Sequence, residues 1–336
     1  MATHNYSAWQ INENDFSHAA SEIDKLNFFA RYAILAPSGH NTQPWEFQDS
    51  GDKLVLSANM TRVLPYSGVQ ANEPYVSLGA CIETLVLAGS GLGYQVNVHF
   101  TLKRNSIAQF SLGKKIKPDP SLLPAILDRV SNRYLYDTEN LPDSTLKAVT
   151  TNNFSDISVK VLSAEDEIGY VARETDLATH RIFGDKHFRL ELSKWVRNNR
   201  TKQYDGMPGF VQEIPTPPSM LAKHIIKRIN VSKDQSKKDT KRIIASANLI
   251  FVNIKNESLQ ALIDGGRIYA RICVLAQQQQ LATSGLGTAI IDPQSRTEII
   301  KRFKLDGKPI AIIRIGKAAK QARHTPRWTL PHVQSD

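Results

Sequence analysis

Cysteine is scarce in this chain of 336 residues, which contains only Cys81 and Cys273. Both lie within apolar patterns of helical spacing, so we expect each to be a small buried hydrophobe. Two cysteines without further ligands nearby provide neither a disulfide framework nor a metal site. We therefore expect no bound metal.

Long hydrophobic runs are also lacking. The longest nearly uncharged stretch, from Pro74 to Val98, contains Glu83 and six glycines or serines. This composition predicts a buried helix followed by a strand rather than a membrane span. The N-terminal residues show no basic segment followed by an apolar one, so no signal peptide is evident. We expect a cytoplasmic protein without a membrane partner.

Acidic residues are fewer than basic ones. The chain has 32 Asp and Glu and 42 Lys and Arg, so its formal net charge is +10. Much of the excess lies in residues 222–244, whose pattern predicts two amphipathic helices around a polar turn near Lys233–Asp239. Nucleic-acid surfaces usually interleave aromatic side chains with basic ones, and this segment has none. We expect solvated basic faces and no nucleic-acid partner.

An approximate internal repeat indicates duplication. Residues 87–93 are LAGSGLG and residues 281–287 are LATSGLG, an offset of 194 positions. In both copies we predict a long apolar helix that ends at Gly-Leu-Gly, where glycine can adopt the left-handed conformation. A β-rich run would then follow, at 94–100 in the first copy and 288–292 in the second.

The remaining pattern alternates helices with hairpins and isolated strands, which predicts an α+β fold. A Lys- and Pro-rich stretch at 111–124 marks a boundary, so we predict halves at 1–118 and 119–336. Residues 204–219, with two glycines and four prolines, are predicted to form a lid. The predicted strands are 45–48, 54–58, 96–102, 108–112, 157–162, 248–254 and 310–315. The predicted helices are 19–35, 120–130, 143–150, 165–197 and 265–283.

Polar residues concentrate in the loop Ala36–Trp45, which follows a predicted helix and precedes a predicted strand. Its Ser38, His40, Asn41 and Gln43 are held between two prolines. Amide side chains donate and accept hydrogen bonds at once, which suits the edge of a heterocycle. The same composition is also typical of an ordinary capped turn.

Two arginine-rich segments complete the set of candidates. Arg129 and Arg133 flank Ser131 in the segment RVSNR, and guanidinium groups four positions apart at a helix end could share one anion. A tail segment, Arg323 to Arg327, follows the last predicted strand and could return to that anion. In a basic protein such motifs also occur by chance.

Together and in this order, these motifs resemble the nitroreductase family, over about residues 24–327. That resemblance implies a flavin-dependent oxidoreductase with bound FMN. It implies phosphate contacts, ring and ribityl contacts, and a backbone that borders the flavin N5 edge. The residues implied are Arg129, Ser131, Arg133 and Arg327 for the phosphate, Ser38, Asn41 and Gln43 for the ribityl chain and ring, and the backbone around Ile291 and Asp292 for the N5 edge. Pro37, Val130 and Arg323 are implied as further cofactor-binding residues.

The chain departs from the ordinary family pattern. The first half has the NTQPW loop without an Arg-x-Ser-x-Arg segment, and the second half has RVSNR without a second loop of that kind. One complete FMN site can be assembled from the two halves. The chain thus resembles a single-chain, twin-domain branch similar to the mycobacterial Acg-type proteins, which implies a monomer with an internal pseudo-dimer and a lid over the flavin.

The resemblance implies NAD(P)H-dependent reduction of electron-poor acceptors such as nitroaromatics or quinones. No catalytic acid or base is assigned, because a bound flavin carries such chemistry. His40 is a candidate substrate contact, although a loop histidine can equally hydrogen-bond locally. The alternative function is an FMN-sequestering or stress-related flavin-binding protein with little or no turnover.

Overall fold

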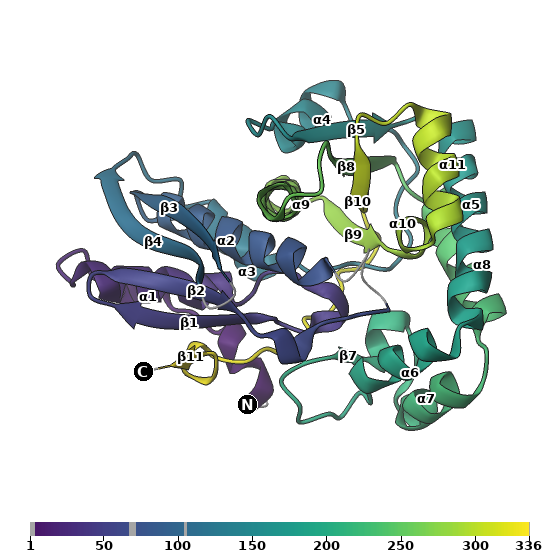
Figure 1. The fold of residues 1–336 in the computed structure, drawn as a ribbon, viewed down its shortest axis with the longest axis horizontal. Coiled ribbons are helices and arrows are strands. Elements are labelled where there is room, and N and C mark those ends of the chain that lie inside the picture. The colour runs from purple at the N-terminus through teal and green to yellow at the C-terminus, as the bar shows by residue number, and fades with distance from the viewer. Residues whose placement is uncertain (1–3, 67–71, 104–105, 336) are drawn as a thin grey trace.

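The computed structural model describes residues 4–66, 72–103 and 106–335, and it confirms the α+β class (Figure 1). Two mainly antiparallel sheets lie on either side of a central pair of packed helices, α2 (Glu73–Gly91) and α9 (Leu259–Gln278). Cys81 and Cys273 are free and buried, as predicted. No helix of the described residues is long and apolar enough to cross a membrane.

The first sheet has the strand order β11-β1-β2-β4-β3. Phe47, Leu56 and Phe110 face the core beneath α1 (Glu22–Ala33) and α2, because alternate residues of a strand lie on the same face. The C-terminal strand β11 joins this sheet parallel to β1, so the end of the chain returns to the first half. The strands are β1 (Trp45–Ser50), β2 (Lys53–Ala58), β3 (Tyr94–Lys103), β4 (Ser106–Lys115) and β11 (Gln334–Ser335).

The second sheet has the order β5-β8-β10-β9 and is covered on both faces. All seven residues of β8 are buried. Ile250 and Val252 pack toward α9, whereas Leu249 and Phe251 pack toward the outer helices. The strands are β5 (Ile157–Leu162), β8 (Asn248–Ile254), β9 (Ala282–Leu286) and β10 (Lys308–Gly316).

The two sheets share one connectivity. Four strands of each, β1-β2-β4-β3 and β5-β8-β10-β9, pair antiparallel in the same order. In each half, the long central helix connects the second of these strands to the strand at the far edge. The second half differs by long helical insertions, between β5 and β8 and between β9 and β10.

The close contact between α2 and α9 shows the true register of the two halves. A Cβ atom on Gly79 would lie 2.0 Å from the carbonyl oxygen of Ile263, and one on Gly266 would lie 2.0 Å from that of Val76. Gly79 and Gly266 are equivalent positions, as are Val76 and Ile263, and the two members of each pair are 187 residues apart in the sequence. The reciprocal contacts relate the halves by an offset of 187 residues.

The predicted offset of 194 is therefore wrong. Residues 87–93 lie in and just after α2, but the matching letters at 282–286 form strand β9, and α9 ends at Gln278. The predicted strand at 288–292 is also wrong, because α10 (Thr288–Ile291) lies there. The two offsets differ by seven residues, which is about two helical turns. The apolar stripes of the helices consequently match in either register.

The helices of the second half also correct several predictions. The predicted helix 165–197 is two helices, because Asp185 caps the second by accepting a hydrogen bond from His187 N. The turn predicted near 233–239 lies inside α8, and the connection is at residues 229–231. The helices are α3 (Leu122–Asp128), α4 (Asp143–Thr150), α5 (Glu165–Gly184), α6 (Lys186–Trp195), α7 (Thr216–Arg228), α8 (Ser232–Ile244), α10 and α11 (Pro293–Phe303).

Candidate functional site

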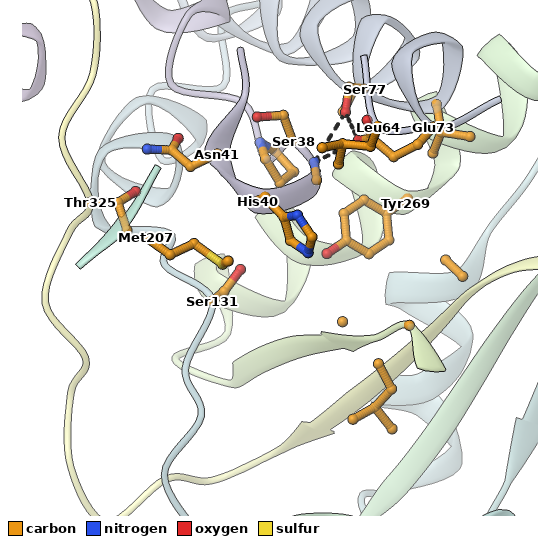
Figure 2. Close-up of a pocket in the computed structure, with 18 of the residues that line it drawn as sticks. Ser38, His40, Asn41, Leu64, Glu73, Ser77, Ser131, Met207, Tyr269 and Thr325 are labelled. Carbon is orange, nitrogen blue, oxygen red and sulfur yellow. Dashed lines mark hydrogen bonds between the residues drawn. The ribbon is translucent and has the colours of Figure 1, made fainter. Parts of the chain in front are cut away.

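A cavity of about 340 Å³ lies where α2, α9, the second sheet and the C-terminal tail meet (Figure 2). This volume falls in the range of about 300–1,000 Å³ that is usual for small-molecule sites. We call it the main cavity. The residues predicted from the sequence that line it are Pro37, Ser38, His40, Asn41, Arg129, Val130, Ser131, Arg133, Ile291, Arg323 and Arg327; Gln43 and Asp292 do not line it.

The loop 36–45 has an unusual backbone. His40, Asn41 and Gln43 have φ values of 48°, 58° and 54°, the left-handed region that non-glycine residues seldom adopt. Hydrogen bonds hold this conformation, because Gln43 N donates to Ser38 Oγ (3.0 Å) and Gly39 N donates to Glu73 Oε1 (2.6 Å). Polar side chains of the loop are thereby positioned at the cavity wall.

Gln43 connects the loop to two distant segments instead of facing the cavity. Its side chain is fully buried, its Nε2 donates to Tyr204 O (2.8 Å), and its Oε1 accepts from Trp328 N (3.0 Å). Tyr204 and Trp328 also stack, with ring centroids 4.6 Å apart. Gln43 therefore fixes the C-terminal tail and the start of residues 204–219, the predicted lid (here the lid segment), against the loop.

The segment RVSNR is extended, not helical. α3 ends at Asp128, and Arg129 has ψ of 123°, which corrects the predicted helix end at Val130. Arg129 is buried and donates to Leu35 O (2.7 Å). Asn132 N donates to Thr283 O (2.8 Å), and its side chain donates to Lys320 O (2.7 Å). The segment thus lies between β9 and the tail.

The C-terminal tail brings Arg327 to the same wall. Arg327 is buried, donates to Thr325 Oγ1 (2.6 Å), and lies 5.3 Å from the centroid of the Trp9 ring. Burial and the nearby charge of Arg129 lower the pKa of Arg327 to about 9. Among the described residues, neither Arg129 nor Arg327 forms an ion pair with a carboxylate.

His324 lies near the charges of Arg129 and Arg327 but does not line the main cavity. Its ring stacks on Trp9 with centroids 4.0 Å apart. Burial and the charges of Arg129 and Arg327 lower the pKa of His324 to about 4, so it is neutral at pH 7. Its Nδ1, like Nε of Arg327, is buried without a hydrogen-bond partner in the described part of the chain. A buried polar atom in this state is costly unless a ligand satisfies it.

Arg133 and Arg323 border the cavity in different ways. Arg323 is exposed and lies 4.2 Å from the centroid of the Phe210 ring. Burial lowers the pKa of Arg133, and the charge of Arg242 lowers it further. Both residues line the main cavity with Arg129 and Arg327, and these four cations make the cavity suited to an anion.

Asp292 has a structural role at the edge of the site. It caps α11 by accepting from Ser295 N (2.8 Å), and it forms an ion pair with Arg181 at 2.7 Å. Burial opposes its ionisation, but the hydrogen bonds from Arg181 and Ser295 outweigh burial and lower its pKa. The neighbouring Ile291 does line the main cavity.

Glu73 is a cavity residue that the sequence analysis did not select. Its Oε1 accepts from Gly39 N and from Ser77 Oγ, as the dashed lines in Figure 2 show. Burial raises the pKa of this carboxyl group, and its Oε2 is buried with no partner among the described residues. The sequence does place Glu73 at the start of a long apolar helix, but the contact with Gly39 requires the tertiary structure.

Aromatic and lid residues complete the walls. His40, Tyr269 and Met207 all line the main cavity (Figure 2). Burial lowers the pKa of His40 to about 4 and raises that of Tyr269, so both groups are neutral at pH 7. Met207 and Phe210 come from the predicted lid segment, here β7 (Met207–Pro208) followed by a 3₁₀ turn at 209–212.

Comparisons with known proteins give distant likenesses. No protein-family model matches the chain. Two uncharacterized proteins of Mycobacterium tuberculosis, MT3212 and Rv3127, are each 22% identical over 325 residues, which covers 90% of this chain and 90% of each relative.

Several solved structures of nitroreductases are also similar in part. One is a nitroreductase with bound FMN from Desulfitobacterium hafniense, at 15% identity and a TM-score of 0.41, covering 62% of this chain and 93% of that one. Another is the FMN-dependent nitroreductase NfnB from Mycobacterium smegmatis in complex with NADPH, at 14% identity and a TM-score of 0.42, covering 65% and 98%.

Proposed function

We propose that the main cavity binds one FMN and that the protein is an FMN-dependent oxidoreductase. The observation that carries this proposal is the group of basic residues without carboxylate partners: Arg129 and Arg327 are both buried beside His324. A phosphate monoester would supply the missing negative charge and accept hydrogen bonds from guanidinium groups. The buried, unpartnered Nε of Arg327, which lines this cavity, fits the same ligand.

The remaining walls suit the rest of the cofactor. Ser38 and Asn41 offer polar contacts for a ribityl chain and a ring edge, and Pro37, Val130 and Ile291 offer apolar contacts. In this proposal Gln43 and Asp292 support the site through Tyr204, Trp328 and Arg181 rather than touching the cofactor. Ser131, Arg133 and Arg323 would complete the phosphate contacts.

Bound FMN would supply the transfer of two electrons from NAD(P)H to an acceptor such as a nitroaromatic or a quinone. The chain's own contribution is position, charge and exclusion of water. Neutral His40 and Tyr269 border the cavity beside Met207, which comes from the lid segment (Figure 2). Burial raises the pKa of Glu73, and its Oε1 accepts from Gly39 N and so orients the loop.

A second candidate function is FMN sequestration without turnover. The ion pair between Glu213 and Arg242 (2.9 Å) favours it, because this contact anchors the lid segment over the cavity. The two functions share the same site and differ in whether a reductant can reach it. Anaerobic addition of NADPH to the purified protein distinguishes them, since only an enzyme would lose the oxidised flavin absorbance.

The cofactor proposal is tested by measuring bound FMN in the wild type and in the Arg129→Gln/Arg327→Gln variant. The wild type should carry about one FMN per chain. Each lost charge-assisted hydrogen bond is worth about 1.5–3 kcal/mol, so the double variant should bind FMN at least about a hundredfold more weakly. Riboflavin, which lacks the phosphate, should lose much less affinity.

Two further variants control this experiment. Arg173→Gln removes a cation that lies over the Tyr170 ring, away from the cavity, and should keep full FMN content. Arg133→Gln keeps the proposal testable if the double variant folds poorly. Arg133 forms no hydrogen bond or ion pair with other described residues, so its replacement should leave the fold intact and still weaken FMN binding. Unchanged FMN affinity in a folded double variant would disprove the phosphate site.

A further inference from the structure

A second cavity, of about 190 Å³, lies beneath the helical insertion between β5 and β8. It shares a wall with the main cavity, formed by His40, Arg133, Met207, Ile291 and residues 285–287. We call it the insertion cavity. Residues from α5, α6, α7 and α8 enclose it on the side away from the main cavity.

One side of the insertion cavity is apolar. Phe183, Phe188, Leu192 and Val196 are buried together in a separate hydrophobic cluster of the described residues. Ile226 from α7 packs against this cluster and also lines the cavity. This side suits a hydrocarbon chain or ring.

The other side of the insertion cavity is basic. Arg133, Arg242 and Arg314 line it, and Asp239 is the only acidic lining residue in the part of the chain that the structure describes. Arg242 is already occupied by Glu213, at 2.9 Å, and by Asp239, at 3.4 Å. Neither of the other two arginines forms an ion pair with a carboxylate in the described part of the chain.

Arg314 is the strongest pointer to a ligand. It is fully buried in β10, where its Nε donates to Ser246 Oγ (2.8 Å) and its Nη2 to Tyr134 O (3.2 Å). Its Nη1 is buried with no partner among the described residues. Leaving a buried charged donor unsatisfied is costly, so a ligand that accepts from it is favoured. The side chain also lies 4.1 Å from the centroid of the Tyr136 ring, which holds it in place.

Two further lining residues have unsatisfied polar atoms. Oγ1 of Thr175, on α5, and Nδ1 of His40 are buried without partners in the described structure. Thr175 is 1% exposed, so solvent does not satisfy its hydroxyl group. A buried cation, a hydroxyl donor and an apolar side therefore border one cavity.

We propose that the insertion cavity binds a small carboxylic acid with an apolar body. Its carboxylate would accept hydrogen bonds from Arg314 Nη1 and from the Thr175 hydroxyl group, and its body would lie against Phe183, Phe188 and Leu192. Guanidinium and carboxylate groups match in charge and geometry. This site goes beyond the proposed FMN site and does not depend on flavin.

Calorimetric titration of the full chain with octanoate tests this proposal, with octan-1-ol as the uncharged probe of equal chain length. Octanoate should bind, and octan-1-ol should bind at least about tenfold more weakly, because it lacks the charge that Arg314 recognises. No heat from octanoate up to millimolar concentration, or equal binding of both probes, would overturn the proposal.

Three variants locate the site. Leu192→Trp fills the cavity and should abolish octanoate binding, whereas Thr175→Val keeps the shape and should weaken it several-fold. Arg314→Gln should weaken it at least tenfold if circular dichroism shows a folded chain. The exposed Thr297→Val is the matched control and should bind octanoate as the wild type does. Wild-type affinity in Leu192→Trp would place the octanoate elsewhere and contradict the proposal.

Flavin content separates this proposal from the previous one. Leu192 does not line the main cavity, so Leu192→Trp should retain its FMN. Titrations are made with flavin-stripped and flavin-loaded protein. If the protein binds octanoate but no FMN, the carboxylate site stands and the FMN site fails. If it binds FMN but no octanoate, the FMN site stands and the carboxylate site fails.

Discussion

Arg327, in the C-terminal tail, donates a hydrogen bond to the side-chain oxygen of Asn41, which lies 286 residues earlier. The amide nitrogen of Asn41 donates to Gly206 O (3.0 Å) and to Pro326 O (2.9 Å). One amide side chain thus connects the loop of the first half, the lid segment and the tail. The cation that we assign to the phosphate depends on this connection for its position.

We expect Asn41→Ala to destabilise the fold and to weaken FMN binding together. The substitution removes three buried hydrogen bonds, each worth about 1 kcal/mol, so the free energy of unfolding should fall by about 2–4 kcal/mol. Urea denaturation measures this change. Asn14→Ala, at an exposed position, should leave stability and FMN content unchanged. Equal stability of the two variants would contradict the role of Asn41.

The contact between α2 and α9 should tolerate no side chain at its two glycines. Gly79→Ala and Gly266→Ala each place a methyl group 2.0 Å from a backbone oxygen of the facing helix. The helices must separate, and we expect each variant to lose at least about 1–3 kcal/mol, as overpacked cores do. The midpoint of guanidinium denaturation measures the loss.

Gly169→Ala is the control for these glycine variants. Gly169 lies within α5, and a Cβ atom there would meet no atom within 4 Å. Alanine is favoured over glycine in a helix by about 1 kcal/mol, so this variant should be slightly more stable than the wild type. If Gly79→Ala were stabilising as well, the close helix contact would not exist.

Stability should fall between pH 6.5 and pH 4 because of His40 and His324. Burial lowers both pKa values from 6.5 to about 4 in the folded chain. Between these values the unfolded chain binds more protons, so their contribution is complete above pH 6.5 and is lost as the pH falls toward 4. Unfolding free energies across this range should decrease less steeply in the His40→Gln/His324→Gln variant. Equal slopes would show that neither ring is held neutral.

We expect the flavin-loaded protein to be a monomer. α2 and α9 pack against each other within one chain, and buried Glu83 accepts hydrogen bonds from Arg267 (2.9 Å) and Arg271 (2.6 Å) across this contact. A self-complementary surface that is already satisfied leaves no drive for a two-fold dimer. Light scattering should give the mass of one 37.5 kDa chain. A stable dimer that loses FMN on dissociation would contradict this model.

Much of the local structure followed from the sequence. The hairpin β1–β2 is confirmed: its strands pair antiparallel around a turn at Gly51, where φ is 64°. The helix over residues 143–150 and the strand over 157–162 have the predicted bounds. In these cases the chain's own pattern and the packing of the folded protein favour the same conformation.

The sequence also predicted the loop residues and arginines that line the main cavity. Glycine, proline and closely spaced cations can be recognised as candidates from the local sequence, before the fold is known. It did not select Glu73 or Tyr269, since helical patterns conceal which residue faces a cavity. Nor did it distinguish Gln43 and Asp292 from their neighbours, because only their tertiary partners direct them away from the cavity.

Nearly the same seven letters form the end of a helix at 87–93 and a strand at 282–286. The sequence by itself determined an α+β fold with related halves, since apolar periodicity is a local property. Only the tertiary structure decided the register of the halves. The reason is physical: β9 gains the hydrogen bonds of β10, and the contacts of Gly79 and Gly266 fix how the two helices meet.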